Sequence, residues 1–99
     1  MRLSLQTQQI IKDTTREIFG TDVHVKVFGS RINDDARGGD IDLLVELPFC
    51  IADSERKVLQ LTARLQLRLG DQPIDVLVID PSTLRQAIHE QATMTGISL

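Results

Sequence analysis

Three strand-like segments, separated by segments with helical spacing, constrain most strongly what this chain of 99 residues can fold into. Residues 23–28 alternate apolar and polar side chains, which predicts a strand with one buried face. Residues 41–47 predict a second strand, which Pro48 helps to end. Residues 73–79 are more continuously apolar, so we expect a third strand that is covered on both faces.

Helical spacing occurs before, between and after these strands. Residues 4–19 predict a helix that Gly20 ends, and residues 53–69 predict another that begins at an Asp cap and ends before Gly70. Asp80-Pro81 predicts a helix start, followed at helical spacing by Leu84, Ala87, Ile88 and Gln91. We therefore expect one α/β (α+β) domain over residues 1–99, with a small mixed sheet of about three strands and flanking helices. Residues 93–99 have no clear assignment.

The composition indicates a soluble cytoplasmic protein. Hydrophobic residues make up 41% of the chain and charged residues 25%, which is enough to build a core. No apolar run approaches the ~20 residues that span a bilayer, and the first residues turn polar too soon for a signal peptide. A single cysteine, Cys50, excludes an internal disulfide and is typical of a reducing compartment.

Negative charge is concentrated in one stretch of the sequence. Residues 31–46 hold five acids and two bases, whereas the rest of the chain is balanced, and the net charge is −3. Such a stretch repels nucleic acid unless a cation bridges the two. With only three aromatic residues for base stacking as well, we expect no stable binding of nucleic acid.

A Gly-Ser pair followed by an Asp-x-Asp motif is the most informative feature for chemistry. Asp40 and Asp42 are two residues apart on a predicted strand, so their carboxylates point to the same face. Paired carboxylates together with substrate phosphates are what Mg²⁺ usually binds. Upstream, Gly29 permits close backbone approach, while Ser30 and Arg31 offer hydrogen-bond donors to a phosphate.

Asp75 is a third carboxylate, inside an otherwise apolar strand where a lone charge is costly to bury. Proximity to Asp40 and Asp42 across the sheet would relieve that cost. Three carboxylates can hold two divalent ions, of which one activates an attacking hydroxyl and the other steadies a leaving pyrophosphate.

The Gly29-Ser30 pair, the Asp40-Ile41-Asp42 motif and the later Asp75 together resemble the signature of the DNA-polymerase-β-like nucleotidyltransferases. The short chain is most similar to the minimal nucleotidyltransferases of that superfamily. The resemblance implies that Gly29 and Ser30 hold the phosphates of ATP and that Asp40, Asp42 and Asp75 hold Mg²⁺ and carry out catalysis. The sequence departs from the family pattern at Gly38-Gly39, where a polar residue is common.

The same resemblance implies a partner and a biological role. Minimal nucleotidyltransferases are commonly encoded beside a helical HEPN toxin, and the family implication is transfer of AMP from ATP to a tyrosine hydroxyl of that partner. The protein would then act as the antitoxin. Leu59, Leu67 and residues 97–99 are candidates for the surface that docks the partner.

Each feature also has a plainer interpretation. A Gly-Ser pair is often only a turn, Arg31 is as well explained as a surface residue, and Asp75 can simply face solvent at a sheet edge. A non-catalytic antitoxin that acts by occlusion, and a transferase acting on a small molecule, are the alternative functions. His24, His89 and Cys50 lack the spacing of zinc ligands, so we interpret them as structural and expect His24 to face solvent.

Overall fold

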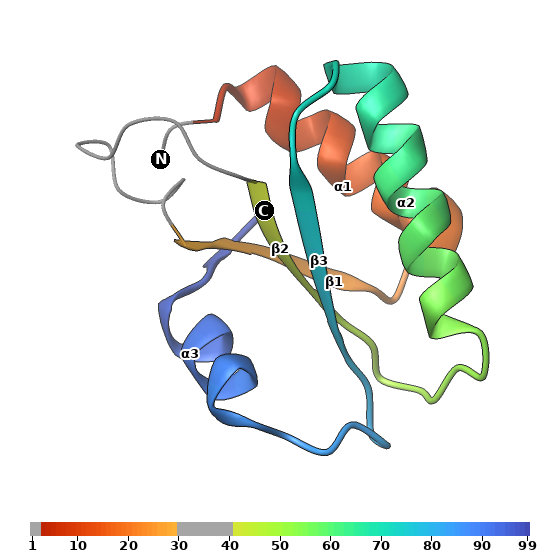
Figure 1. The fold of residues 1–99 in the computed structure, drawn as a ribbon, viewed down its shortest axis with the longest axis vertical. Helices are drawn as coiled ribbons and strands as arrows, with labels where there is room; N and C mark the ends of the chain where they lie inside the picture. The colour runs from red at the N-terminus through yellow and green to blue at the C-terminus, as the bar shows by residue number, and fades with distance from the viewer. Residues whose placement is uncertain (1–2, 30–40) are drawn as a thin grey trace.

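A computed structural model of the chain describes residues 3–29 and 41–99. Within these residues, three helices pack around a single sheet (Figure 1). The sheet has four strands in the order β3-β2-β1-β4, which confirms the predicted α+β class with one strand more than expected. β1 is antiparallel to both β2 and β4, while β2 and β3 are parallel and are connected through α2. The elements are α1 (Leu5–Phe19), β1 (His24–Phe28), β2 (Ile41–Glu46), α2 (Ser54–Leu69), β3 (Ile74–Ile79), α3 (Ala87–Thr95) and β4 (Ile97–Ser98).

The first two helices begin and end close to the predicted positions. At the start of α1 the Ser4 hydroxyl accepts a hydrogen bond from the Thr7 amide at 3.1 Å. Asp53 precedes α2 as predicted, although its side chain makes no capping hydrogen bond. Gly20 and Gly70 end the two helices with φ angles of +99° and +95°, a backbone region that glycine enters without steric cost.

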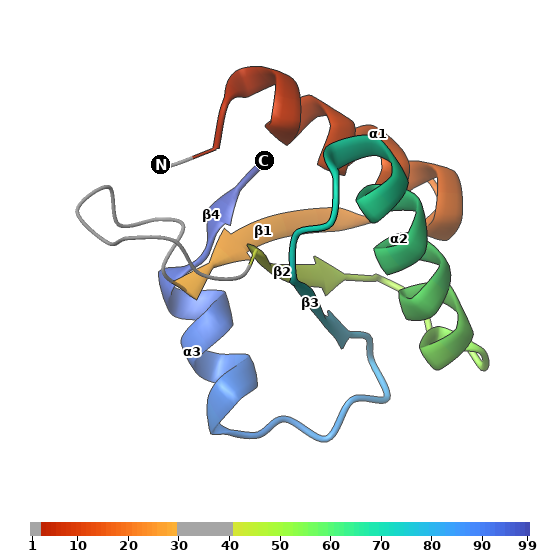
Figure 2. The same ribbon diagram turned by 45° about the horizontal axis from the view of Figure 1, so that its top comes forward.

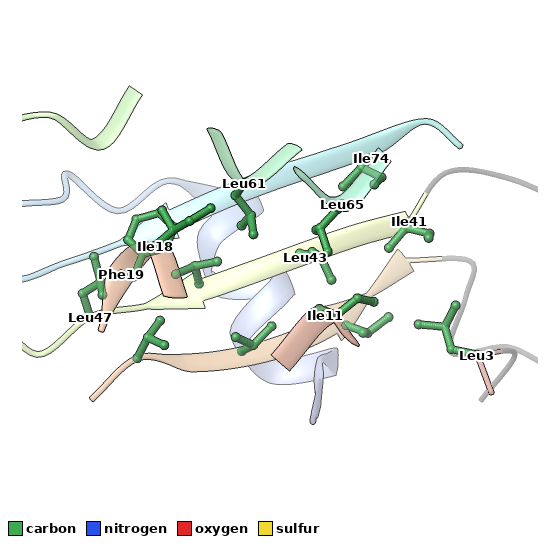
Figure 3. Packing of buried hydrophobic residues seen from close by; sticks show 14 residues of the cluster. Leu3, Ile11, Ile18, Phe19, Ile41, Leu43, Leu47, Leu61, Leu65 and Ile74 are labelled. Atoms are coloured by element: carbon green, nitrogen blue, oxygen red, sulfur yellow. The ribbon is translucent and has the colours of Figure 1, made fainter. Parts of the chain in front are cut away.

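The two faces of the sheet are covered differently, as Figure 2 shows, with α1 and α2 on one side and α3 on the other. We call the side under α1 and α2 the core face. Here alternate strand residues meet the apolar stripes of both helices (Figure 3), and the fully buried side chains at its centre include Ile11, Val27, Ile41, Leu43, Val45, Leu61 and Leu65. Burial on this face accounts for most of the hydrophobic core.

The opposite side, which we call the carboxylate face, has a smaller apolar cluster. It consists of Leu44, Ile79 and Ala92, with Phe28 and Leu77 packed against them. α3 contributes Ala92 to this cluster and covers only part of the face. Asp42 and Asp75 belong to the same face, because strand side chains alternate and their neighbours Ile41 and Ile74 point into the main core.

The prediction of a helix start at Asp80-Pro81 was wrong. The Asp80 carboxylate accepts hydrogen bonds from the amide and the hydroxyl of Ser82, at 2.8 and 2.6 Å, and these bonds close a turn. The helix begins only at Ala87, where the side chains of Gln86 and His89 form a reciprocal cap. Short polar side chains in this turn bind backbone groups that the predicted helix would have used. No helix therefore forms at Leu84, and its side chain stays exposed.

The third strand and the chain end also differ from expectation. β3 was predicted to be covered on both faces, but it is an edge strand, with Asp75 exposed and the next three residues only half-buried. Residues 97 and 98, which had no assignment, form β4 and pair with Val27 and Lys26 of β1. None of the helices within residues 3–29 and 41–99 has both the length and the apolar character that crossing a membrane requires.

Candidate functional site

Asp42 and Asp75 lie next to each other on parallel neighbouring strands. The register of β2 and β3 pairs the two residues directly, and strands in such a pair are about 4.8 Å apart. Both side chains project from the carboxylate face, where Asp42 is half-buried and Asp75 is exposed. The predicted proximity of these two acids is therefore confirmed, and the exposure of Asp75 on an edge strand agrees with the plainer alternative interpretation of this residue.

Gly29 lies directly against the Asp42 carboxyl group. Its φ is +76°, and a Cβ placed on it would overlap Oδ2 of Asp42 and lie 3.2 Å from Cγ. Phe28, the last residue of β1, is the cross-strand partner of Asp42, and this pairing brings the following residue beside the carboxylate. An L-residue at position 29 would be strained at this φ, and its Cβ would overlap Oδ2 unless the Asp42 side chain moved, so the close approach of backbone to carboxylate favours glycine.

Three of the six predicted site residues can be placed. Gly29, Asp42 and Asp75 come together at one end of the sheet, from the end of β1 and the starts of β2 and β3. Ser30, Arg31 and Asp40 lie outside the described residues, so their roles stay predictions. Within the described residues, no group of three or more His, Cys, Asp or Glu side chains could hold a metal.

Charge on the carboxylate face is partly balanced further along the strands. Lys26 of β1 pairs with Glu46 of β2 at 3.1 Å, and its ammonium is also 3.5 Å from the Thr93 carbonyl of α3. The Lys26 ammonium therefore interacts with groups near the end of β2 that is far from Asp42. The end of the face with Asp42 and Asp75 carries two neighbouring carboxylates, a type of group that Mg²⁺ can bind.

Two apolar side chains border the carboxylates and were not among the predicted site residues. Phe28 stands opposite Asp42, and Leu77 is two residues beyond Asp75 on the same face. Both are half-buried against Leu44. The period-two pattern of β1 and β3 already placed them on the carboxylate face, and this was the signal that could have identified them.

The remaining candidates do not join this site. His24 is exposed as predicted, with its Nε2 2.9 Å from the Ser98 hydroxyl, and His89 is part of the cap of α3. Cys50 is exposed. An apolar groove of about 440 Å³ between α2 and β3, lined by Val58, Leu59, Val76 and Val78 among others, opens on the core face and so lies away from the two carboxylates.

Comparison with known proteins adds no identification. No model of a known protein family matches the chain, and neither does any curated protein. The described residues combine an α+β fold with two in-register carboxylates beside a glycine of positive φ.

Proposed function

We propose that this protein is a Mg²⁺-dependent nucleotidyltransferase that moves AMP from ATP to a protein hydroxyl. The observation that carries the proposal is the pairing of Asp42 with Asp75 beside the Gly29 backbone. In the sequence, Asp40 stands two residues before Asp42, and Ser30 follows Gly29. The set has the residue types of the minimal nucleotidyltransferases that the sequence resembles.

The donor set fits magnesium. Mg²⁺ prefers carboxylate oxygens and binds through one or two of them together with substrate phosphates. Asp42 and Asp75, with Asp40, would hold two such ions, which when bound neutralise the triphosphate and lower the pKa of the acceptor hydroxyl. The exposure of Asp75 leaves room for phosphate oxygens and water beside the protein ligands.

Different residues of the chain would bind the phosphates and accept the proton. Gly29 and Ser30 would bind the ATP phosphates through backbone amides and a hydroxyl, next to the Asp42 carboxylate that Gly29 contacts. Asp75 would accept the proton of the acceptor hydroxyl. The hydroxyl oxygen then bonds to the α-phosphorus, the bond from that phosphorus to the bridging oxygen of the β-phosphate breaks, and pyrophosphate leaves.

A helical HEPN-type partner is the proposed acceptor, and transfer to one of its tyrosines would make this protein an antitoxin in the cytoplasm. The acidic stretch around the site disfavours a polynucleotide, whereas a tyrosine is uncharged on approach. Phe28 and Leu77 offer an apolar surface beside the carboxylates for an aromatic ring.

Exposed apolar side chains occur on both sides of the sheet. Leu59 and Leu67 of α2 are 71% and 87% exposed, as predicted, but α2 covers the core face. Leu84 and Met94 are each 83% exposed. Leu84 precedes α3 and Met94 belongs to it, and α3 covers part of the carboxylate face (Figure 2). A partner that presents a tyrosine to Asp75 would reach it more directly from the α3 side, so we favour Leu84 and Met94 as docking residues.

The deciding experiment is incubation of the protein with ATP labelled at the α-phosphate and Mg²⁺. Separate reactions offer the co-encoded protein, tRNA and other RNA as acceptors, and mass spectrometry locates the label. We expect one AMP on a tyrosine of the partner protein. Label on RNA would contradict the acceptor class, and label on a small molecule would favour the alternative of a small-molecule transferase.

A binding module without catalysis is the second candidate, because exposed leucines favour an interaction surface whatever the chemistry. Asp42→Asn separates the two functions. An occluding antitoxin would keep its inhibition of the partner after this change, whereas a transferase would lose it. Asp22→Asn is the matched control, since Asp22 is exposed in the turn before β1, at the end of the sheet opposite to Asp42 and Asp75.

A further inference from the structure

The outer edge of β3 is not paired with another strand in the described part of the chain. β3 stands last in the strand order, and its ladder joins it to β2 alone. In the parallel register the Leu47 amide donates to the Ile79 carbonyl at 2.8 Å, so the odd-numbered residues of β3 bond toward β2. Because backbone groups alternate along a strand, the amides and carbonyls of Val76 and Val78 point outward.

This edge lacks the features that usually protect an exposed strand edge. Natural edge strands are commonly short, charged or interrupted by proline. Residues 74–79 include no proline and no lysine, and Asp75 is their single charged residue. The other five are apolar, and this pattern is what predicted a strand covered on both faces. The sequence of β3 is therefore that of a strand with a neighbour on each side.

The apolar groove between α2 and β3 lies along the same edge. Its volume is about 440 Å³, and its apolar walls are Val76 and Val78 of β3 and Val58 and Leu59 of α2. The two valines whose backbone groups point outward are thus the ones whose side chains line the groove. A strand added to β3 would bond to those backbone groups and direct alternate side chains toward Leu59, which is 71% exposed.

The charges around this groove are unevenly distributed. Glu55 lines it at the start of α2, and Asp71 is exposed just before β3 begins. None of its lining residues is basic. Three of the four bases of α2, Lys57, Arg64 and Arg68, contact α1 instead. A segment that carries positive charge near its ends therefore complements this edge.

A second copy of the chain fits the edge less well. Antiparallel pairing of β3 with its copy, centred on Val76, would place Asp75 of each copy opposite Leu77 of the other. The two carboxylates would then be diagonal neighbours on one face of the joined sheet, where like charges repel. The edge therefore favours a segment of a different protein.

We propose that an extended segment of another protein adds to the outer edge of β3 as a further strand. The segment has apolar residues at alternate positions, which enter the groove beside Leu59, and lysine or arginine near its ends, close to Glu55 and Asp71. The inference does not rest on the proposed function, since the groove opens on the core face, away from the two carboxylates.

The test is an NMR titration of the isotope-labelled full chain with a synthetic seven-residue peptide. The peptide has three valines at alternate positions, threonines between them and a lysine at each end. We expect saturable shifts of the Val76 and Val78 amides and slower hydrogen exchange at both. The amides of Leu77 and Ile79 already face β2, so their exchange should change by less than about twofold.

Two matched variants of α2 test the groove. Leu59→Arg removes an apolar wall and adds a positive charge there, so it should weaken peptide binding about tenfold or more. Leu67→Arg makes the same change at a residue that is 87% exposed and does not line the groove, and it should leave binding within about twofold. Glu55→Lys, which reverses the charge of the lining, should weaken binding about threefold or more. Circular dichroism checks the fold of all three variants.

Altered peptides and the oligomeric state test the occupant. The peptide with glutamates at its ends should bind at least about fivefold more weakly, and proline at its three central positions should abolish binding, because the amide donors of a strand are lost. Equal weakening by Leu59→Arg and Leu67→Arg, equal binding of the glutamate peptide, or no shift at Val76 and Val78 would overturn the proposal. So would a dimer in sedimentation equilibrium that Leu59→Arg dissociates and Leu67→Arg does not, since a second copy would then be the occupant.

Discussion

The backbone of Gly29 is in contact with the carboxyl group of Asp42, so closely that a methyl group at position 29 would overlap with Oδ2. The two residues belong to successive strands, and the register of Phe28 with Asp42 sets their approach. A residue that would otherwise be interpreted as a simple turn glycine therefore shapes the surroundings of the carboxylate.

Gly29→Ala should destabilise the protein and abolish nucleotide transfer. The substitution combines a positive φ, which costs an L-residue about 1 kcal/mol or more, with overlap against Asp42. Gly20→Ala is the matched control, because Gly20 also has a positive φ but nothing lies within 4 Å of the position of its added Cβ. Urea unfolding should show a larger loss for Gly29→Ala than for Gly20→Ala. Equal losses would mean that the overlap with Asp42 has no energetic consequence.

Asp42→Asn should leave the fold intact and remove the response to magnesium. A ligand that binds only the folded state raises its stability, so Mg²⁺ should raise the Tm of the unmodified protein. The effect should disappear in Asp42→Asn and persist in Asp22→Asn, because Asp22 is at the opposite end of the sheet. Differential scanning calorimetry with and without Mg²⁺ measures both. An unchanged magnesium response in Asp42→Asn would contradict the assignment of this carboxylate as a ligand.

Leu61 and Leu67 differ sharply in their expected contributions, although they are less than two turns apart on α2. Leu61 is fully buried in the main core, and its replacement by Ala should lower the free energy of unfolding by about 2–5 kcal/mol. Leu67 is 87% exposed, so Leu67→Ala should change it by less than about 0.5 kcal/mol. Chemical denaturation of both variants provides the measurement. A large loss from Leu67→Ala would show that this leucine is covered in solution.

The ion pair between Glu17 and Arg68 predicts a specific dependence on pH. The hydrogen bond from Arg68 holds the pKa of the Glu17 carboxyl below its ordinary value of 4.5. A lowered folded pKa means that the contribution to stability is present above pH 4.5 and is lost as the pH falls through the folded value. Carbon NMR titration of Glu17 in Arg68→Gln should show the pKa move back up. Its staying unchanged would exclude Arg68 as the cause.

The sequence predicted most of the elements because their patterns are local. The alternation along residues 41–47 predicted that Asp42 and Leu43 point to opposite faces of the sheet, and the burial of Leu43 agrees with that prediction. The position of β3 at the edge was not predictable in this way, because strand order depends on long-range packing. The start of α3 was predicted wrongly for a different reason. The Asp80 carboxylate, which was expected to cap a helix, instead accepts a hydrogen bond from the hydroxyl of Ser82.

The placement of Asp75 beside Asp42 was predictable in part. An acid inside an apolar strand indicated a shared polar site, and the parallel register confirms the neighbourhood of these two residues. The contact between Gly29 and Asp42 was not predicted, since a glycine after a strand has many uses. Sequence pattern gives the direction of a side chain, whereas the distance between two strands' ends depends on register and twist.

The parallel pairing of β2 with β3 also has a consequence for how the site comes into being during folding. Gly29 and Asp42 are joined by an antiparallel pair close in sequence, whereas Asp75 arrives only after α2 has crossed over the sheet and β3 has docked. Closing that longer loop is the slower event, because its entropy is lost before any contact rewards it. The two carboxylates therefore come together only when β3 pairs with β2.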